Sequence, residues 1–201
     1  MIAIIDYGAG NLYSVKNALT SLGVDARITG NAEEILAADK LILPGVGAFG
    51  DAMAALERAG LCVPITSSIS AGKPFLGICL GMQLLFSQSE ESPGISGLGI
   101  FQGDFRRIPK VGDLKIPHIG WNSLTLSENS KIFRNLGEHP YVYFVHSYYL
   151  EPQNPSDVSA WVEYGTRFAV AAERDNVFCV QFHPEKSGDT GLKILENFVN
   201  L

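Results

Sequence analysis

The stretch Phe75–Gln83, FLGICLGMQ, carries the strongest signal in this 201-residue chain. An apolar run ends at a Gly-x-Cys-x-Gly segment centred on Cys79, and the residues after it continue in a helix-like pattern. A nucleophile on a tight strand-to-helix turn needs neighbouring glycines, because a Cβ there would collide with the backbone. The pattern predicts a nucleophile elbow that projects Cys79 from a strand end, at a helix start that favours a thiolate. The alternative is a small buried hydrophobic residue, the usual state of a free cysteine.

A second motif, His183-Pro184-Glu185, follows an apolar strand-like run at 177–182 and favours the reactive interpretation. Pro184 biases His183 towards an extended backbone, in which residues i and i+2 share a face. Glu185 can then bond one imidazole nitrogen of His183 and leave the other nitrogen free to face a thiol. Cys79, His183 and Glu185 together predict a catalytic triad.

The composition is that of a single folded domain over residues 1–201. Hydrophobic residues make up 46% of the chain and charged residues 18%, which is ordinary for a protein with a substantial core. The net charge of −6 at pH 7 and the lack of any Lys/Arg cluster leave no electrostatic footprint for nucleic acid or an anionic membrane. We therefore expect neither as a partner.

The N-terminal residues and the cysteines predict a cytoplasmic protein. Met1–Asp6 has neither the basic region nor the length of a signal peptide, and no apolar stretch is long enough to span a bilayer. The three cysteines are an odd number without metal-ligand spacing, which fits a reducing compartment. Cys62 and Cys179 lie among apolar neighbours and are expected in the core. We expect no metal and no cofactor.

The order of apolar and helical segments predicts an α/β fold with an open, mostly parallel sheet flanked by helices. Wholly apolar strands that alternate with helices are typical of a parallel sheet covered on both faces. The second half is strand-rich, with further strands expected, several antiparallel, before a closing helix. Strands are expected at 2–5, 24–28, 41–43, 75–78, 100–108, 121–126, 141–148, 158–164, 168–173 and 177–182, and helices at 11–22, 31–38, 51–59 and 188–200.

Two glycine-rich loops follow predicted strands. Asp6–Asn11, DYGAGN, lacks the third glycine of a dinucleotide fingerprint, so a tight turn with Asn11 capping a helix is favoured. In Pro44–Gly50, PGVGAFG, the glycines allow a peptide unit to adopt either of two orientations, one of which points an N–H at a developing oxyanion. The backbone of Leu80 supplies a second such donor. The alternative for this loop is a plain turn.

Three motifs, in this order along the chain, resemble those of class I (triad) glutamine amidotransferases, which release ammonia from glutamine for a coupled synthase. They are Pro44–Gly47, Gly77–Gln83 and His183–Glu185. Finer features resemble the glutaminase subunits of imidazole glycerol phosphate synthases in histidine biosynthesis, and the resemblance covers essentially the whole chain. These features are DYGAGN at Asp6–Asn11, PHIGWN at Pro117–Asn122 and FVHSYY at Phe144–Tyr149.

The resemblance implies a role for each matching residue. Cys79 attacks the glutamine side-chain amide, His183 transfers protons and Glu185 orients His183. Glu91 has a neighbour, Glu90, and such a carboxylate pair is often only a solvated surface. His146 is alternatively a structural histidine bonded to backbone. The implied oxyanion residues are Gly45, Val46 and Leu80, and the implied glutamine-binding residues are Gly47, Gln83, Glu91, His146, Ser147 and Tyr148.

The resemblance also implies a partner, a separate cyclase subunit with a (β/α)8 barrel, because no sequence follows the closing helix. Ammonia passes to it through a channel and is used to form imidazole glycerol phosphate and aminoimidazole carboxamide ribonucleotide. The implied interface residues are Asn11, His118, Trp121 and Lys186. For Trp121 the alternative is core packing, and for Lys186 it is a solvated side chain. Since the oxyanion loop has two orientations, the isolated chain is expected to be a poor glutaminase.

Other functions remain open at this point. The glutaminase of another synthase, such as that for anthranilate, GMP or pyridoxal phosphate, would keep the triad but not the patterns at 6–11 and 117–122. A thiol peptidase or γ-glutamyl hydrolase would keep the elbow and need no partner. A binding module on the same fold would be expected to lose Cys79 or His183, and both are present.

Overall fold

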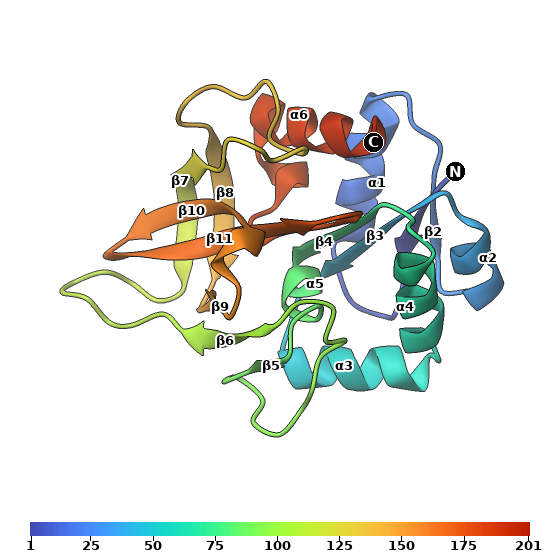
Figure 1. Cartoon of the computed structure of the whole chain (residues 1–201), viewed down its shortest axis with the longest axis horizontal. Coiled ribbons are helices and arrows are strands. Elements are labelled where there is room, and N and C mark those ends of the chain that lie inside the picture. The colour runs from blue at the N-terminus through green and yellow to red at the C-terminus, as the bar shows by residue number, and fades with distance from the viewer.

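Five short apolar strands form the parallel half of a twelve-stranded mixed sheet, in a computed structural model that describes residues 1–201 (Figure 1). Their order across the sheet is β2-β1-β3-β4-β12. β1, β4 and β12 are wholly buried and β3 nearly so, which is why their side chains are almost all apolar, whereas the edge strand β2 exposes Arg27. The bounds are β1 Ile2–Ile5, β2 Ala26–Thr29, β3 Lys40–Gly45, β4 Phe75–Cys79 and β12 Val177–Val180.

The second half of the chain extends this sheet with antiparallel strands. β11 (Thr166–Arg174) pairs with β12, and β10 (Val158–Tyr164), β7 (His118–Leu126) and β8 (Tyr141–His146) follow in that order. A side branch leaves β11 through β9 (Tyr148–Pro152), β6 (Gly103–Arg107) and β5 (Gln88–Ser89), and a 3₁₀ turn, η1 (Pro155–Asp157), precedes β10. The expected α/β fold, with an open parallel sheet and added antiparallel strands, is confirmed.

Helices cover both faces of the parallel strands (Figure 1). Alternate residues of β1 point to opposite faces: Ile2 and Ile4 pack in one apolar cluster and Ala3 and Ile5 in the other. The first cluster includes α1 (Leu12–Ser21) and α6 (Gly188–Val199), and the second includes α2 (Ala32–Ala37), α3 (Phe49–Arg58) and α4 (Cys62–Ser70). Two one-turn elements, α5 (Leu80–Gln83) and η2 (Pro184–Lys186), lie at the ends of β4 and β12. No helix has the length and apolarity needed to cross a bilayer.

Several details differ from the sequence expectations. Helix α4 was not predicted, and the strand expected at 141–148 divides at Ser147 into β8 and β9. Asn11 precedes α1, but its side chain makes no capping hydrogen bond, whereas the Asn31 side chain accepts from the N–H groups of Glu33 and Glu34 at the start of α2.

The elbow tolerates no side chain at Gly81. A Cβ there would lie 1.8 Å from the carbonyl oxygen of Leu43, which belongs to β3. We expect Gly81→Ala to lower the free energy of unfolding by at least about 1–3 kcal/mol, because backbone must move to relieve this overlap. Thermal and urea unfolding would measure it. Gly137→Ala is the matched control, since a Cβ at Gly137 meets nothing within 4 Å; equal stability of the two variants would contradict the prediction.

Candidate active site

The register of three strands brings the sequence motifs to one edge of the sheet. β4 lies between β3 and β12, with Gly45 paired to Cys79 on one side and Val180 paired to Ile78 on the other. The Pro44–Gly50 loop and the His183 motif therefore emerge on either side of Cys79. This is the carboxyl edge of the parallel strands, where open α/β sheets bind ligands.

The backbone at Cys79 has the conformation of a nucleophile elbow. Cys79 has φ 56° and ψ −114°, a backbone conformation that residues other than glycine rarely adopt. Both flanking glycines are required by space, because a Cβ at Gly77 would lie 2.8 Å from the Gly81 carbonyl oxygen. The structure thus confirms the reason predicted for the two glycines, that a Cβ at either position would collide with backbone.

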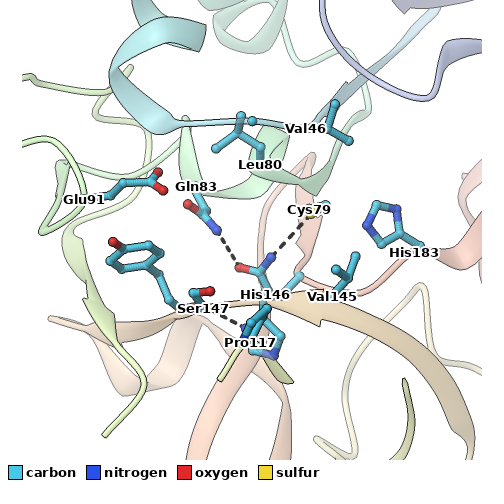
Figure 2. Close-up of a pocket in the computed structure, with 13 residues that line it drawn as sticks. Val46, Cys79, Leu80, Gln83, Glu91, Pro117, Val145, His146, Ser147 and His183 are labelled. Carbon is cyan, nitrogen blue, oxygen red and sulfur yellow. Dashed lines mark hydrogen bonds between the residues drawn. The ribbon is translucent and has the colours of Figure 1, made fainter. Parts of the chain in front are cut away.

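A cavity of about 290 Å³ opens over Cys79 (Figure 2). It brings together nearly all of the residues predicted for catalysis, the oxyanion and glutamine binding; Gly45 and Glu185 do not line it. Pro117, Val145 and Gln181 also line it and were not predicted. The lining residues are Val46, Gly47, Cys79, Leu80, Gln83, Glu91, Pro117, Val145, His146, Ser147, Tyr148, Gln181 and His183.

His183 is held by Glu185 as the motif predicts. The Nδ1 atom of His183 lies 2.8 Å from Oε1 of Glu185, and both side chains are at least 97% buried. The second ring nitrogen, Nε2, is buried without a partner, and the ring lies next to Cys79 (Figure 2). Burial lowers the pKa of His183, but the neighbouring Cys79 and Glu185 outweigh it and raise the pKa to about 9. The imidazole is thus able to carry a proton at neutral pH beside the sulfur.

Among the cavity residues that the sequence did not predict, Gln181 is the one that bonds to the nucleophile. Its Nε2 donates to the sulfur of Cys79 at 3.7 Å, and its Oε1 accepts from Nε2 of Gln83 at 3.0 Å. The signal was present in the chain: Gln181 lies two residues before His183, and in an extended segment such residues share a face. The spacing that relates His183 to Glu185 thus also relates Gln181 to His183.

His146 and His118 form a buried pair of neutral imidazoles. His146 Nδ1 donates to the Tyr148 carbonyl oxygen at 2.9 Å, which leaves His146 Nε2 to accept from His118 Nδ1 at 3.0 Å. Burial lowers the pKa of His146 to about 3 and that of His118 to about 4. His146 is thus the backbone-bonded histidine of the alternative interpretation, although its ring also lines the cavity.

The residues expected at a partner interface lie in different environments. His118 departs from that expectation: only 3% of it is exposed, because its ring stacks between Phe144 and Tyr164. Trp121 is 55% exposed and so does not pack in the core. Lys186 is exposed and Asn11 is partly buried.

Glu91 has a definite partner at the edge of the cavity. Its Oε2 accepts from the backbone N–H of Phe49, the first residue of α3, at 2.8 Å. Its neighbour Glu90 accepts from the N–H of Arg107 and does not line the cavity. No three His, Cys, Asp or Glu side chains are grouped so that they could hold a metal ion.

A cysteine elbow, an adjoining His-Glu pair and a glycine loop at one strand edge match a known family. The model of the glutamine amidotransferase class-I family matches residues 3–201. The chain belongs to this family. Two similar curated relatives are the imidazole glycerol phosphate synthase subunits HisH of Methanothermobacter thermautotrophicus, 52% identical over 201 residues (100% of this chain, 98% of the relative), and of Caldanaerobacter subterraneus, 52% identical over 198 residues (98% and 97%).

Solved structures support the same fold for this amidotransferase. A crystal structure of a glutamine amidotransferase covers 98% of each chain with a TM-score of 0.77 at 20% identity. A chain in the structure of PurLQS from Thermotoga maritima covers 99% of this chain and 97% of its own length, with a TM-score of 0.77 at 20% identity. At this identity the likeness concerns the fold alone.

The carboxylate of Glu185 is one cause of the raised pKa of His183, so neutralising it has a predicted sign. In Glu185→Gln the pKa of His183 should fall below about 9, because an amide stabilises the imidazolium less than a carboxylate does. The imidazolium would then lose its proton at lower pH than in the wild type. An NMR titration of labelled histidine, with the His183 signal assigned from His183→Asn, measures the change. Glu196→Gln, which removes an exposed carboxylate paired with Lys193, is the control. An equal pKa of His183 in the wild type, Glu185→Gln and Glu196→Gln would refute the pairing of His183 with Glu185.

Proposed function

We propose that this amidotransferase is the glutaminase subunit of a cytoplasmic imidazole glycerol phosphate synthase, which hydrolyses glutamine and delivers ammonia to a separate cyclase subunit. The observation that carries the proposal is that Cys79 and His183 line one amino-acid-sized cavity, with Glu185 bonded to the far nitrogen of His183. The relatives at 52% identity add the synthase, since they are named as its subunits.

The first half of the reaction is the release of ammonia. The Cys79 thiolate attacks the γ-amide carbon of glutamine, and the carbonyl oxygen becomes an oxyanion. This oxyanion accepts hydrogen bonds from the backbone N–H of Leu80 and from that of the Val46 peptide unit. His183, protonated at Nε2, gives its proton to the amide nitrogen as the carbon–nitrogen bond breaks. Ammonia leaves, and a γ-glutamyl thioester on Cys79 remains.

The second half restores the enzyme. The now neutral His183 accepts a proton from water at Nε2, and the oxygen of that water attacks the thioester carbon. The carbon–sulfur bond breaks, glutamate leaves and the thiolate with its imidazolium returns. Glu185 stabilises the imidazolium in both halves. Gln83, Glu91 and the backbone at 146–148 surround the α-amino and α-carboxylate groups of the substrate.

An exposed apolar face next to the cavity supports the cyclase partner. Ile119 and Val145 are directly paired across β7 and β8, and Trp121 lies two residues along on the same face. Ile119, Trp121, Tyr141 and Val145 are 59, 55, 56 and 36% exposed. Val145 also lines the cavity, so this face is continuous with the active site. A (β/α)8 barrel seated there would cover the cavity mouth and receive ammonia before water protonates it.

The test of the function compares glutamine turnover by the chain alone, with a cyclase subunit, and with the cyclase subunit plus its nucleotide ligand. We expect low turnover from the chain alone and an increase of about a hundredfold or more in the full system, because one oxyanion donor typically contributes that factor. Cys79→Ser should lower glutamine-dependent synthesis at least about a thousandfold and leave ammonia-dependent synthesis intact. Loss of both activities together, or no synthesis with any cyclase, would reject the assignment.

The apolar face can be tested by one substitution with a matched control. Ile119→Ser should weaken cyclase binding about tenfold, because burial of this side chain in the complex is lost. Val63→Ser is the control, since Val63 is 71% exposed on α4 and outside the face. Isothermal titration calorimetry gives the affinities; equal effects of Ile119→Ser and Val63→Ser would exclude this face.

Lys186 lies next to Glu185 along the chain. Lys186→Ala should reduce the coupling between binding of the cyclase ligand and glutamine turnover.

A further inference from the structure

The sulfur of Cys79 ends a chain of two side-chain amides in the lining of the cavity, whose hydrogen bonds are the dashed lines between Gln83 and Cys79 in Figure 2. Gln83 donates through Nε2 to Oε1 of Gln181, and Gln181 donates through Nε2 to Cys79 Sγ. The two glutamines come from different elements, α5 and the segment after β12, and both are at least 94% buried. A buried amide that donates to sulfur stabilises the charged form of that sulfur more than the neutral form.

We propose that Gln181 is a further catalytic residue, whose amide N–H stabilises the Cys79 thiolate and whose orientation is fixed by Gln83. A free glutamine amide can rotate by half a turn and present its oxygen instead, which would repel a thiolate. In the structure the Gln83 Nε2 donor pairs with the oxygen of Gln181 and so holds the Gln181 N–H towards the sulfur. The sulfur therefore has two stabilising neighbours, His183 on one side and the Gln181 amide on the other.

The same chain of amides extends to the substrate position. The remaining oxygen of Gln83, Oε1, is buried and has no partner, and Gln83 lines the cavity. An ammonium group of a bound amino acid can donate to that oxygen, which polarises Gln83, then Gln181. Binding of the substrate and activation of the nucleophile are in this way connected by hydrogen bonds. This connection rests on the proposed function, whereas the stabilisation of the thiolate by Gln181 does not.

The charged and titratable groups around Cys79 make the effect measurable through pH. They are His183 with its partner Glu185, and Tyr7, Glu91, His146 and Tyr148. Burial, followed by the Cys79 charge, raises the pKa of Tyr7 well above its usual range, and burial lowers the pKa of His146 to about 3, so both are neutral between pH 5 and 9. The change of reactivity with pH in that interval therefore reports on the Cys79–His183 pair and on what stabilises it.

The experiment measures the rate at which iodoacetamide alkylates Cys79 as a function of pH, by mass spectrometry of the peptide that contains it. Gln181→Leu should lower the rate at neutral pH about tenfold and move the pH midpoint upward by about one unit, the usual effect of losing one hydrogen bond to a charged group. Gln181→Glu, which is nearly isosteric, should move the midpoint further, because a carboxylate repels the thiolate. Gln153→Glu adds the same charge at an exposed position and should match the wild type.

The result that overturns the proposal is an unchanged midpoint in both Gln181 variants, even if their stability or glutamine turnover falls, because Gln181 would then act by packing alone. Thermal unfolding checks that the variants are folded, and Gln181→Glu carries the test if Gln181→Leu is not. Alkylation requires no glutamine and no cyclase. A wild-type protein that shows no glutaminase activity even with a cyclase subunit would therefore reject the proposed function and leave this result standing.

Discussion

The contact on which the site depends is the approach of the elbow to β3, where Gly81 leaves no room between itself and the carbonyl oxygen of Leu43. This contact holds the elbow directly against β3, so that Cys79 pairs with Gly45, the last residue of β3. The residues that follow Gly45 then form the oxyanion loop beside the sulfur. β12 then pairs on the other side of β4 and delivers Gln181 and His183 to the sulfur. One close backbone contact thus positions groups from three strands, and glycine is required because any Cβ would separate them.

Burial limits the number of charged side chains around Cys79. Tyr7, which lies near Cys79, and His146, which lines the cavity, stay neutral because desolvation disfavours their charged forms. His146 additionally has both ring nitrogens occupied, by a carbonyl oxygen and by His118. His183 is equally buried, but two anionic neighbours reverse the effect of desolvation and raise its pKa to about 9. The cavity therefore gives the thiolate one cationic partner, and that partner is also the group that must supply a proton to the leaving ammonia.

Local patterns in the sequence predicted what depends on neighbours along the chain. The elbow, the bond between His183 and Glu185 and the alternation of apolar strands with helices all follow from spacings of a few residues, and the structure has them. What was missed depends on contacts between distant segments. Gln181 acquires its role only because β12 pairs with β4, and His118 is buried only because Phe144 and Tyr164 enclose its ring. No periodicity within either segment records those neighbours.

The oxyanion loop is tied at both ends, which limits any rearrangement to its middle. Gly45 is held by its pairing with Cys79, and a Cβ there would lie 2.6 Å from the Tyr7 hydroxyl oxygen, so it has no freedom to move inward. At the other end Glu91 accepts from the Phe49 N–H, and the Ser92 hydroxyl accepts from Gly50. Val46 between them is 47% exposed, and Gly47 has φ 100°, where glycine is favoured. A partner that covers Val46 would therefore act on a unit of three residues, 46–48, and turning one peptide there changes the donors offered to the oxyanion without disturbing the sheet.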